Sequence, residues 1–186
     1  MKSSKIIAGV DEVGRGSLIG SVYSAAVILG QINTINDLMD SKKISNKKRK
    51  LIANEIIMQS LSVSIGIATK DEIDSMNIHN ATLLSMKRAI NNLSITPGIV
   101  YVDGLYCPDL TIPCHSVVKG DEKVPEISAA SIIAKVARDN EMIYINKFFK
   151  MYQFDKNKGY ATPKHLDTIS YLGKTIHHRE SFLKLK

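Results

Sequence analysis

One stretch of the sequence, residues 11–16, constrains the fold and the chemistry of this chain more than any other. An apolar, strand-like run at residues 6–10 ends at two adjacent carboxylates, Asp11 and Glu12, and a Gly-Arg-Gly turn follows at once. Hard divalent cations prefer oxygen ligands such as carboxylates. The glycines let backbone approach a ligand closely, and the arginine offers a permanently charged, planar fork suited to phosphate. The stretch therefore indicates chemistry on a phosphodiester.

The overall composition is that of a soluble globular protein with a basic surplus. The chain has 186 residues, of which 44% are hydrophobic and 23% charged, and this length suits one well-packed domain better than two. Lysine and arginine outnumber acidic residues 25 to 18, for a formal net charge of +7. That surplus permits binding to nucleic acid, but a solvated basic surface without a partner accounts for it equally well.

The sequence gives no indication of export or of a membrane span. The apolar run near the start is broken by Asp11 and Glu12 before it reaches the length of a signal-peptide core, and no apolar stretch approaches membrane-spanning length. Cys107 and Cys114 match neither a zinc-binding spacing nor a disulfide framework. We therefore expect a cytoplasmic protein with reduced thiols and no membrane partner.

Alternating and helical apolar patterns predict an α/β domain with a mixed sheet. Strands are predicted at residues 5–11, 20–29, 61–69, 99–102 and 112–118. Helices are predicted from an N-cap at Ser45 to about residue 59, at 71–76, at 79–93, from Pro125 to about residue 151, and at 165–172. The rest of the tail from residue 153 is polar and is predicted to be loop-rich.

A third acid, Asp103, follows the short apolar run at residues 99–102. In open α/β sheets, the carboxyl ends of the strands are where ligands usually bind, although Asp-Gly is also an ordinary turn pair. Neighbouring residues of a regular strand face opposite sides of the sheet. Asp11 and Glu12 can therefore join one site only if the chain bends out of the strand there, which Gly14 and Gly16 would allow.

A fourth acid, Asp139, lies in the long predicted helix. It shares one helix face with three apolar residues, Ile132, Val136 and Ile143. A carboxylate set into an apolar face needs a cation, because burying it unpaired is costly. Lys135 or Arg138 could supply that cation as a local salt bridge, but the three other acids favour a metal.

Six segments of the chain, in order, resemble the motifs of bacterial ribonuclease HII. They are DEVGRG at 11–16, DSKK at 40–43, YVDG at 101–104, AASIIAKVARD at 129–139, KGY at 158–160 with Thr162 and His165, and HHRESF at 177–182. The match runs from near the N-terminus nearly to the C-terminus. Each segment alone is moderately specific, whereas the ordered set is highly specific.

The resemblance implies a ribonuclease H-like α/β fold, with a mixed five-stranded sheet flanked by helices. It implies one catalytic domain at residues 1–186, in which the segment from about residue 153 completes the substrate groove. It also implies two divalent cations, Mg²⁺ or Mn²⁺, bound by four catalytic acids, Asp11, Glu12, Asp103 and Asp139. The implied reaction is a two-metal hydrolysis that cuts the RNA strand of RNA–DNA hybrids and cuts 5′ of ribonucleotides in duplex DNA, leaving a 3′-hydroxyl and a 5′-phosphate.

The resemblance further implies how substrate is bound. Gly14, Arg15 and Gly16 contact the ribose 2′-hydroxyl and the backbone at an RNA–DNA junction, and Arg15 favours type HII over type HIII. Tyr160 stacks on the sugar beyond the junction. Without the resemblance, a tyrosine at this position would be interpreted as a half-exposed aromatic residue in a loop. Phosphate contacts are implied for Ser41, Lys42, Lys43 and Lys119. The expected partners are RNA–DNA hybrid and ribonucleotide-containing duplex DNA, and the expected state is a monomer.

Two other protein classes fit parts of the sequence. A nucleotide-binding domain would use the glycine turn, but Gly14, Gly16 and Gly20 miss the dinucleotide-binding spacing by one residue, and a strand-like run follows them. A non-catalytic module that binds hybrids would use the lysines and leave the acids without a role. The five histidines form no zinc-binding pattern, and His165 is a candidate for structuring the substrate loop.

Overall fold

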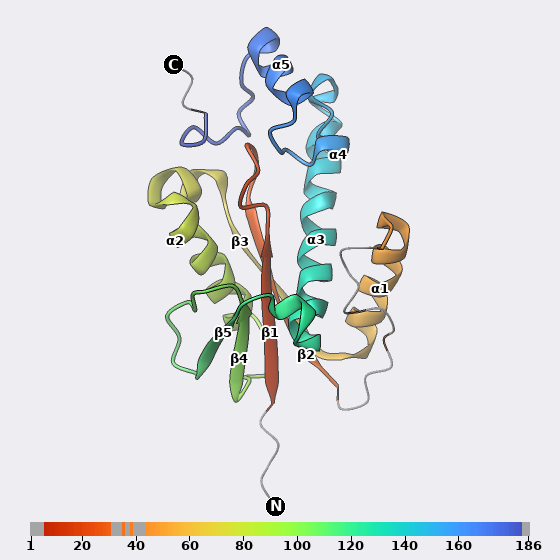
Figure 1. Cartoon of the computed structure of the whole chain (residues 1–186), viewed down its shortest axis with the longest axis vertical. Coiled ribbons are helices and arrows are strands. Elements are labelled where there is room, and N and C mark those ends of the chain that lie inside the picture. Colours follow the sequence, from red (N-terminus) through yellow and green to blue (C-terminus); the bar gives the residue numbers. More distant parts are fainter. Residues whose placement is uncertain (1–5, 31–34, 36–37, 39–43, 184–186) are drawn as a thin grey trace, which may run out of the picture.

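A mixed sheet lies at the centre of the molecule (Figure 1). The computed structural model describes residues 6–30, 35, 38 and 44–183, and within these ranges the sheet has five strands in the order β3-β2-β1-β4-β5. The strands are β1 (Ile7–Val13), β2 (Val22–Leu29), β3 (Ser60–Ala68), β4 (Ile99–Asp103) and β5 (Cys114–Val117). β1, β2 and β3 pair antiparallel, whereas β4 pairs parallel with β1 and with β5. All the strands predicted from the sequence are confirmed, with ends that differ by at most two residues.

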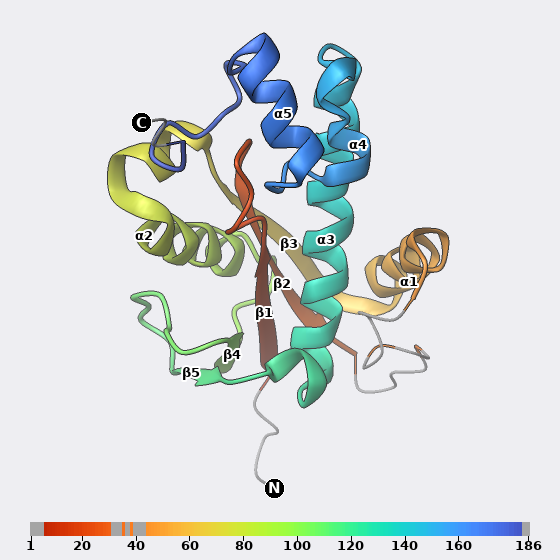
Figure 2. The same ribbon diagram turned by 45° about the horizontal axis from the view of Figure 1, so that its top comes forward.

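Helices cover both faces of the sheet. Figures 1 and 2 show α2 (Lys70–Asn91) on one side, with α3 (Pro125–Asn146) and α1 (Asn46–Gln59) on the other. Strand β2 alternates between the two cores: Ala26 and Ile28 pack with residues of α2, whereas Ala25 and Val27 pack with residues of α1 and α3. This alternation is the period of two that predicts a strand buried on both faces.

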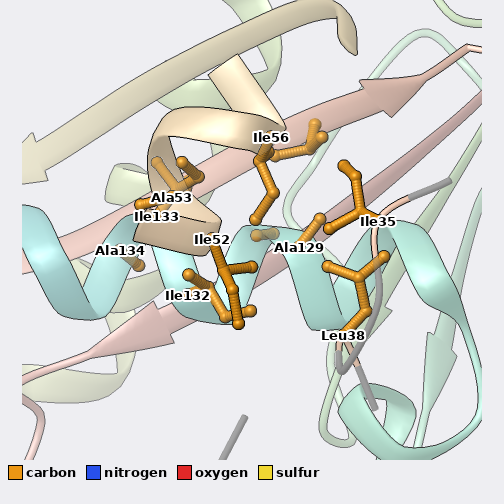
Figure 3. Close-up of a cluster of buried hydrophobic side chains, with 12 residues drawn as sticks. Ile35, Leu38, Ile52, Ala53, Ile56, Ala129, Ile132, Ile133 and Ala134 are labelled. Atoms are coloured by element: carbon orange, nitrogen blue, oxygen red, sulfur yellow. The ribbon is translucent and has the colours of Figure 1, made fainter. Parts of the chain in front are cut away.

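The core between α1 and α3 is built from interleaved apolar side chains (Figure 3). Ile52 and Ile56 of α1 meet Ala129 and Ile132 of α3, and Ile56 is fully buried. Complete burial of an isoleucine side chain stabilises the fold by about 1.5–3 kcal/mol. On its other side, α3 lies directly on β1 at Gly9, where a Cβ would come 2.1 Å from the carbonyl carbon of Glu126. This close contact fixes the distance of α3 from the strand that carries the first acids.

The predicted helix starts are confirmed. Ser45 is the N-cap of α1 and accepts a hydrogen bond from the Lys48 amide at 3.3 Å, and Pro125 begins α3. The two helices predicted at 71–76 and 79–93 correspond to one element, α2, with a kink at Asn77 (φ 70°, ψ 163°). The Asn77 side chain accepts from the amides of His79 and Asn80, so it caps the second half of α2.

The predicted end of the long helix is wrong. α3 ends at Asn146 rather than near residue 151, and a 3₁₀ turn, η3 (Lys150–Tyr152), follows. Tyr152 and Phe154 turn inward there and join a buried cluster with Met142 and Ile19, a burial that a continued helix would not provide. Two further elements, α4 (Phe154–Asn157) and η2 (Gly120–Glu122), were not predicted, whereas α5 (Pro163–Leu172) was.

The C-terminal segment returns to the turn after β1. The Arg179 amide donates to the Leu18 carbonyl at 2.8 Å, the Gly20 amide donates to the His177 carbonyl at 2.9 Å, and Ile19 forms an antiparallel bridge with His178. In Figure 2, this part of the chain passes beside the end of β1. Within the described residues, no helix combines the length and the apolar character needed to cross a membrane.

Candidate active site

The first and third predicted acids lie side by side at one edge of the sheet. β1 and β4 run parallel with Val10 opposite Val102, so Asp11 and Asp103 occupy the next positions at the carboxyl end of the pair. Asp11 is buried, with 7% of its surface exposed. The Asp103 Oδ1 atom accepts a hydrogen bond from the Gly120 amide at 2.6 Å. The sheet thus brings together two residues that are far apart in the sequence, at the edge where α/β folds bind ligands.

The carboxylates at this edge share a negative electrostatic environment. Burial raises the pKa of Asp11 well above its usual value, and the charges of Glu12 and Asp103 raise it further. A hydrogen bond with Ser131 of α3 lowers this pKa and so offsets part of the rise. Burial also raises the pKa of Glu12, with Asp103 adding to the rise and Arg15 opposing it. The Arg15 Nη1 atom lies 3.3 Å from Glu12 Oε1. Carboxylates held this way favour binding of a cation, because a cation relieves their mutual repulsion.

The bend expected at Asp11 and Glu12 is not where the sequence suggested. β1 remains paired with β2 through Val13, so both acids lie within the regular strand. Asp103 nevertheless raises the pKa of both, so the two carboxylates interact with the same neighbour without the expected bend. The Glu12 amide donates to Asp11 Oδ1 at 2.7 Å, so the two residues are linked locally. The chain leaves the strand only at Gly14, where φ is +93°. Strand β2, rather than a helix, follows this turn, which disfavours a dinucleotide-binding motif.

Asp139 lies on the face of α3 that is turned toward Asp11. Ser131, Lys135 and Asp139 are four residues apart in succession, so they share one helix face, and Ser131 hydrogen-bonds Asp11. Asp139 is 7% exposed, and its Oδ1 atom lies 2.7 Å from the Lys135 ammonium. The local salt bridge considered from the sequence is therefore present. The apolar stripe around Asp139 is shorter than predicted, because Ile143 is 38% exposed.

The acids do not form a ready-made chelating group. Across residues 6–30, 35, 38 and 44–183, no cluster of three or more His, Cys, Asp or Glu side chains is arranged to hold a metal ion. The structure brings Asp11, Glu12 and Asp103 into electrostatic contact and leaves Asp139 paired with Lys135. The predicted metal-binding role of the four acids therefore stays a prediction.

The Gly-Arg-Gly segment forms a tight turn with an exposed tip. The Ser17 amide donates to the Gly14 carbonyl at 3.3 Å, and Arg15 and Gly16 are exposed between these two buried residues. A Cβ on Gly16 would lie 3.7 Å from the Tyr160 ring, so the turn and this tyrosine stand next to each other. Two substrate-binding candidates that are distant in the sequence are thus adjacent, and Tyr160 is 39% exposed.

The predicted phosphate-binding residues are only partly described. Lys119 is exposed, has a left-handed backbone (φ 55°), and precedes the glycine whose amide holds Asp103. It therefore lies next to the acidic edge. Ser41, Lys42 and Lys43 fall outside the described residues.

The loop that carries Tyr160 is held by a pair of buried histidines. His165 Nδ1 lies 2.8 Å from the Tyr160 carbonyl, and His165 Nε2 lies 3.2 Å from His178 Nε2. Burial lowers the pKa of both histidines, that of His178 to about 4, with the charge of His165 contributing to the latter shift. His165 thus contacts the loop that it was expected to structure, whereas the part played by His178 was not predicted.

Arg179 is a second residue near the site that sequence reasoning missed. Its side chain is completely buried, and its guanidinium donates to the carbonyls of Gly14, Arg15, Gly20 and Ser21. In the sequence it stands in a polar tail, where an arginine is ordinarily exposed. The only available signal was its place in the HHRESF segment, which assigns it no contact.

Known proteins resemble this chain in both sequence and structure. The family model described as Ribonuclease HII matches residues 8–185. A curated ribonuclease HII from the bacterium Psychromonas ingrahamii is 53% identical over 181 residues, which cover 97% of this chain and 89% of that protein.

Two solved structures agree closely with the fold. One is the complex of PCNA with RNase HII from Archaeoglobus fulgidus, with a TM-score of 0.80 and 27% identity over 97% of this chain and 96% of that one. The other is the ribonuclease H2 of Pyrococcus horikoshii OT3, with a TM-score of 0.79 and 26% identity over 95% and 93% of the two chains. The fold is thus that of a ribonuclease H-like nuclease.

The family model and the bacterial relative go further than the fold. The chain belongs to the ribonuclease HII family. It is accordingly a ribonuclease H, an endonucleolytic hydrolase that acts on nucleic acid. This excludes the non-catalytic binding module considered from the sequence.

Proposed function

We propose that this enzyme cuts the RNA strand of RNA–DNA hybrids and cuts on the 5′ side of ribonucleotides embedded in duplex DNA. The products are a 3′-hydroxyl and a 5′-phosphate on the ribonucleotide. One observation carries the proposal: an exposed glycine turn, adjacent to Tyr160, follows directly on the strand that places Asp11 beside Asp103. Groups suited to a phosphodiester and groups suited to a sugar therefore lie within one short stretch of surface.

Two divalent cations, Mg²⁺ or Mn²⁺, fit the acidic edge by its chemistry. The available donors are carboxylate oxygens, and the pKa of Asp11 and of Glu12 is raised by burial first and by neighbouring negative charges second. Asp11, Glu12, Asp103 and Asp139 would hold the metal. Asp139 would exchange its Lys135 partner for it. When bound, such a pair supplies an activated water and stabilises the leaving oxygen.

The residues of the chain itself account for the choice of substrate. Only a ribonucleotide carries a 2′-hydroxyl, which both donates and accepts hydrogen bonds. In our proposal, the backbone of residues 14–16 contacts this hydroxyl, and the Arg15 side chain, beside Glu12, contacts the adjacent phosphate. Tyr160 stacks on the following deoxyribose, where its ring leaves no room for a second 2′-hydroxyl. The segment from about residue 153 thereby completes the substrate groove.

A basic margin extends the contact to the phosphate backbone. Lys119 is exposed next to the acidic edge. On the basis of the resemblance, we propose that Ser41, Lys42 and Lys43 also contact substrate phosphates. Lysines that neutralise phosphates release counterions, so affinity should fall as salt is raised. An affinity that stays level across a salt titration would argue against this margin.

A single cleavage assay tests the proposal. A duplex with one ribonucleotide, labelled at the 5′ end of that strand, is incubated with the protein in the presence and absence of Mg²⁺. We expect one cut, 5′ of the ribonucleotide, that requires the metal. Asp139→Asn should abolish the cut while the duplex still binds. Cleavage at other positions, or unchanged turnover by Asp139→Asn, would contradict the proposal.

A further inference from the structure

We propose that Arg179 is a positioning residue that orients two peptide groups of the recognition turn, so that the amides of Arg15 and Gly16 face the substrate. This inference rests on the proposed function, in which the backbone of residues 14–16 reads the ribose. It assigns a role in substrate selection to a side chain that lies behind the turn.

The Arg179 guanidinium donates hydrogen bonds to two pairs of consecutive backbone carbonyls. Nη2 donates to the Gly14 carbonyl at 2.8 Å, and Nη1 donates to the Arg15 carbonyl at 2.9 Å. Nε donates to the Gly20 carbonyl at 2.9 Å, and Nη2 also lies 3.2 Å from the Ser21 carbonyl. A planar fork with five fixed N–H groups can hold such a set, whereas a lysine ammonium cannot. One side chain thus ties both sides of the turn together.

The cost of burying this charge indicates that the contacts matter. The Arg179 side chain is 0% exposed, and burial lowers its pKa to about 10, so it remains charged at neutral pH. A buried charge without compensating partners is strongly destabilising. The four carbonyls supply that compensation. A hydrophobic side chain would fill the same space without the cost, so the hydrogen bonds are the property that only arginine provides here.

The direction of the amides follows from peptide geometry. In a trans peptide, the carbonyl and the N–H of one group point in opposite directions. The Gly14 and Arg15 carbonyls both point at Arg179. The N–H groups of Arg15 and Gly16 therefore point away from it, on the side where these two residues are exposed. Successive N–H groups turned the same way bind anions and hydroxyl oxygens.

The backbone of the segment that carries Arg179 is anchored at two places. The Arg179 amide bonds the Leu18 carbonyl at 2.8 Å. On the other side, Asp74 of α2 accepts from the amides of Glu180 and Ser181 at 3.0 and 2.9 Å. The backbone around Arg179 is therefore anchored by contacts that do not involve its guanidinium. Asp74 supports the same tail without touching residues 14–16, which makes it a matched control.

The test compares Arg179→Lys with Asp74→Asn on a duplex that contains one ribonucleotide. Loss of folded protein lowers the apparent kcat, but it leaves KM unchanged because KM does not depend on enzyme concentration. We expect Arg179→Lys to raise KM by about tenfold or more, since charge-assisted hydrogen bonds orient the turn. Asp74→Asn should keep KM within about twofold of the wild type even where it lowers the melting temperature. A wild-type KM in Arg179→Lys would overturn the positioning role.

A second measurement needs no variant and holds even if Arg179→Lys fails to fold. The ¹⁵N-labelled wild-type protein is titrated, without divalent cations, with the ribonucleotide duplex and with an all-DNA duplex of the same sequence. We expect the Arg15 and Gly16 amide resonances to shift with the first duplex and not with the second. Equal shifts, or none, would overturn the inference. Failure of the wild type to cut at the ribonucleotide would instead overturn the proposed function.

Discussion

The imidazole rings of His165 and His178 are both buried and meet through their Nε2 atoms, which lie 3.2 Å apart. The Thr175 amide donates to His178 Nδ1 at 2.8 Å, which assigns the His178 proton to Nε2. His178 then donates to His165 Nε2, and His165 donates from Nδ1 to the Tyr160 carbonyl at 2.8 Å. The chain of hydrogen bonds is complete only when both rings are neutral. Protonation of either ring would add a third N–H proton to the pair and break this chain of hydrogen bonds.

We therefore predict that acid destabilises the fold through this pair. The pKa of His178 is about 4 in the folded state against 6.5 for an ordinary histidine, so the unfolded chain binds the proton more tightly. Stability contributed by the neutral ring is present above pH 6.5 and is lost as the pH falls from 6.5 toward 4. The expected loss is roughly 1–3 kcal/mol. Urea unfolding across this range measures it. His178→Gln, which cannot titrate, should flatten the profile, and an unchanged profile would rule out this source.

Gly14→Ala should disturb the recognition turn. Gly14 has a φ of +93°, and an added Cβ would lie 2.9 Å from the Arg138 Nε atom and 3.2 Å from the Ser21 carbonyl. We expect a loss of about 1–3 kcal/mol in stability together with a higher KM for a ribonucleotide-containing duplex. Gly173→Ala is the matched control, because Gly173 has a φ of +83° with open space around it. The control should lose stability but keep its KM. A similar KM change in both variants would point to a global effect.

Lys135→Met should make stability depend on metal. The Lys135 ammonium lies 2.7 Å from Asp139, whose carboxylate would be left buried without a cation. We expect a loss of about 1 kcal/mol or more in EDTA, recovered on addition of Mg²⁺. Thermal denaturation against Mg²⁺ concentration measures this. Lys87→Met removes an exposed ion pair with Asp109 and should show no such recovery. Equal metal responses in the two variants would exclude Asp139 from the metal site.

Ile56→Ala should weaken the support of α3. Ile56 is 0% exposed in the cluster that joins α1 to α3, so its truncation should cost about 2–5 kcal/mol in the free energy of unfolding. Its neighbour Ile57 is 56% exposed, and Ile57→Ala should change stability by roughly 0.5 kcal/mol or less. Chemical denaturation of the two variants provides the comparison. If they were equally destabilised, the packing of α1 on α3 would differ from the structure described.

The parts of the site that sequence reasoning found are those with a local signature. Asp103 was found because an acid directly follows a short apolar strand, and its proximity to Asp11 follows from the parallel pairing of β1 and β4. Asp139 was proposed because an acid interrupts a helix face, and its place at the metal stays a prediction. Both signals are periodic patterns that can be read within about 15 residues.

The parts that were missed depend on tertiary contacts. The helix prediction ran beyond Asn146 because nothing local shows that Tyr152 and Phe154 bury themselves against Met142. Nor does local sequence distinguish the buried Arg179 from an exposed arginine. Its four acceptors are backbone carbonyls, which every residue type has, so the sequence does not mark them. The role of His178 was hidden for a similar reason, because its partner His165 lies in α5, 13 residues earlier, and only the fold of the tail brings the two rings together.

The link between Arg179 and Gly14 joins positions 165 residues apart in the chain. Asp11, Asp103 and Asp139 all precede the C-terminal segment in the sequence, so they are synthesised before residues 177–181. The brace of the turn is therefore among the last contacts that the chain can complete during biosynthesis, because it requires a residue near the C-terminal end of the described chain.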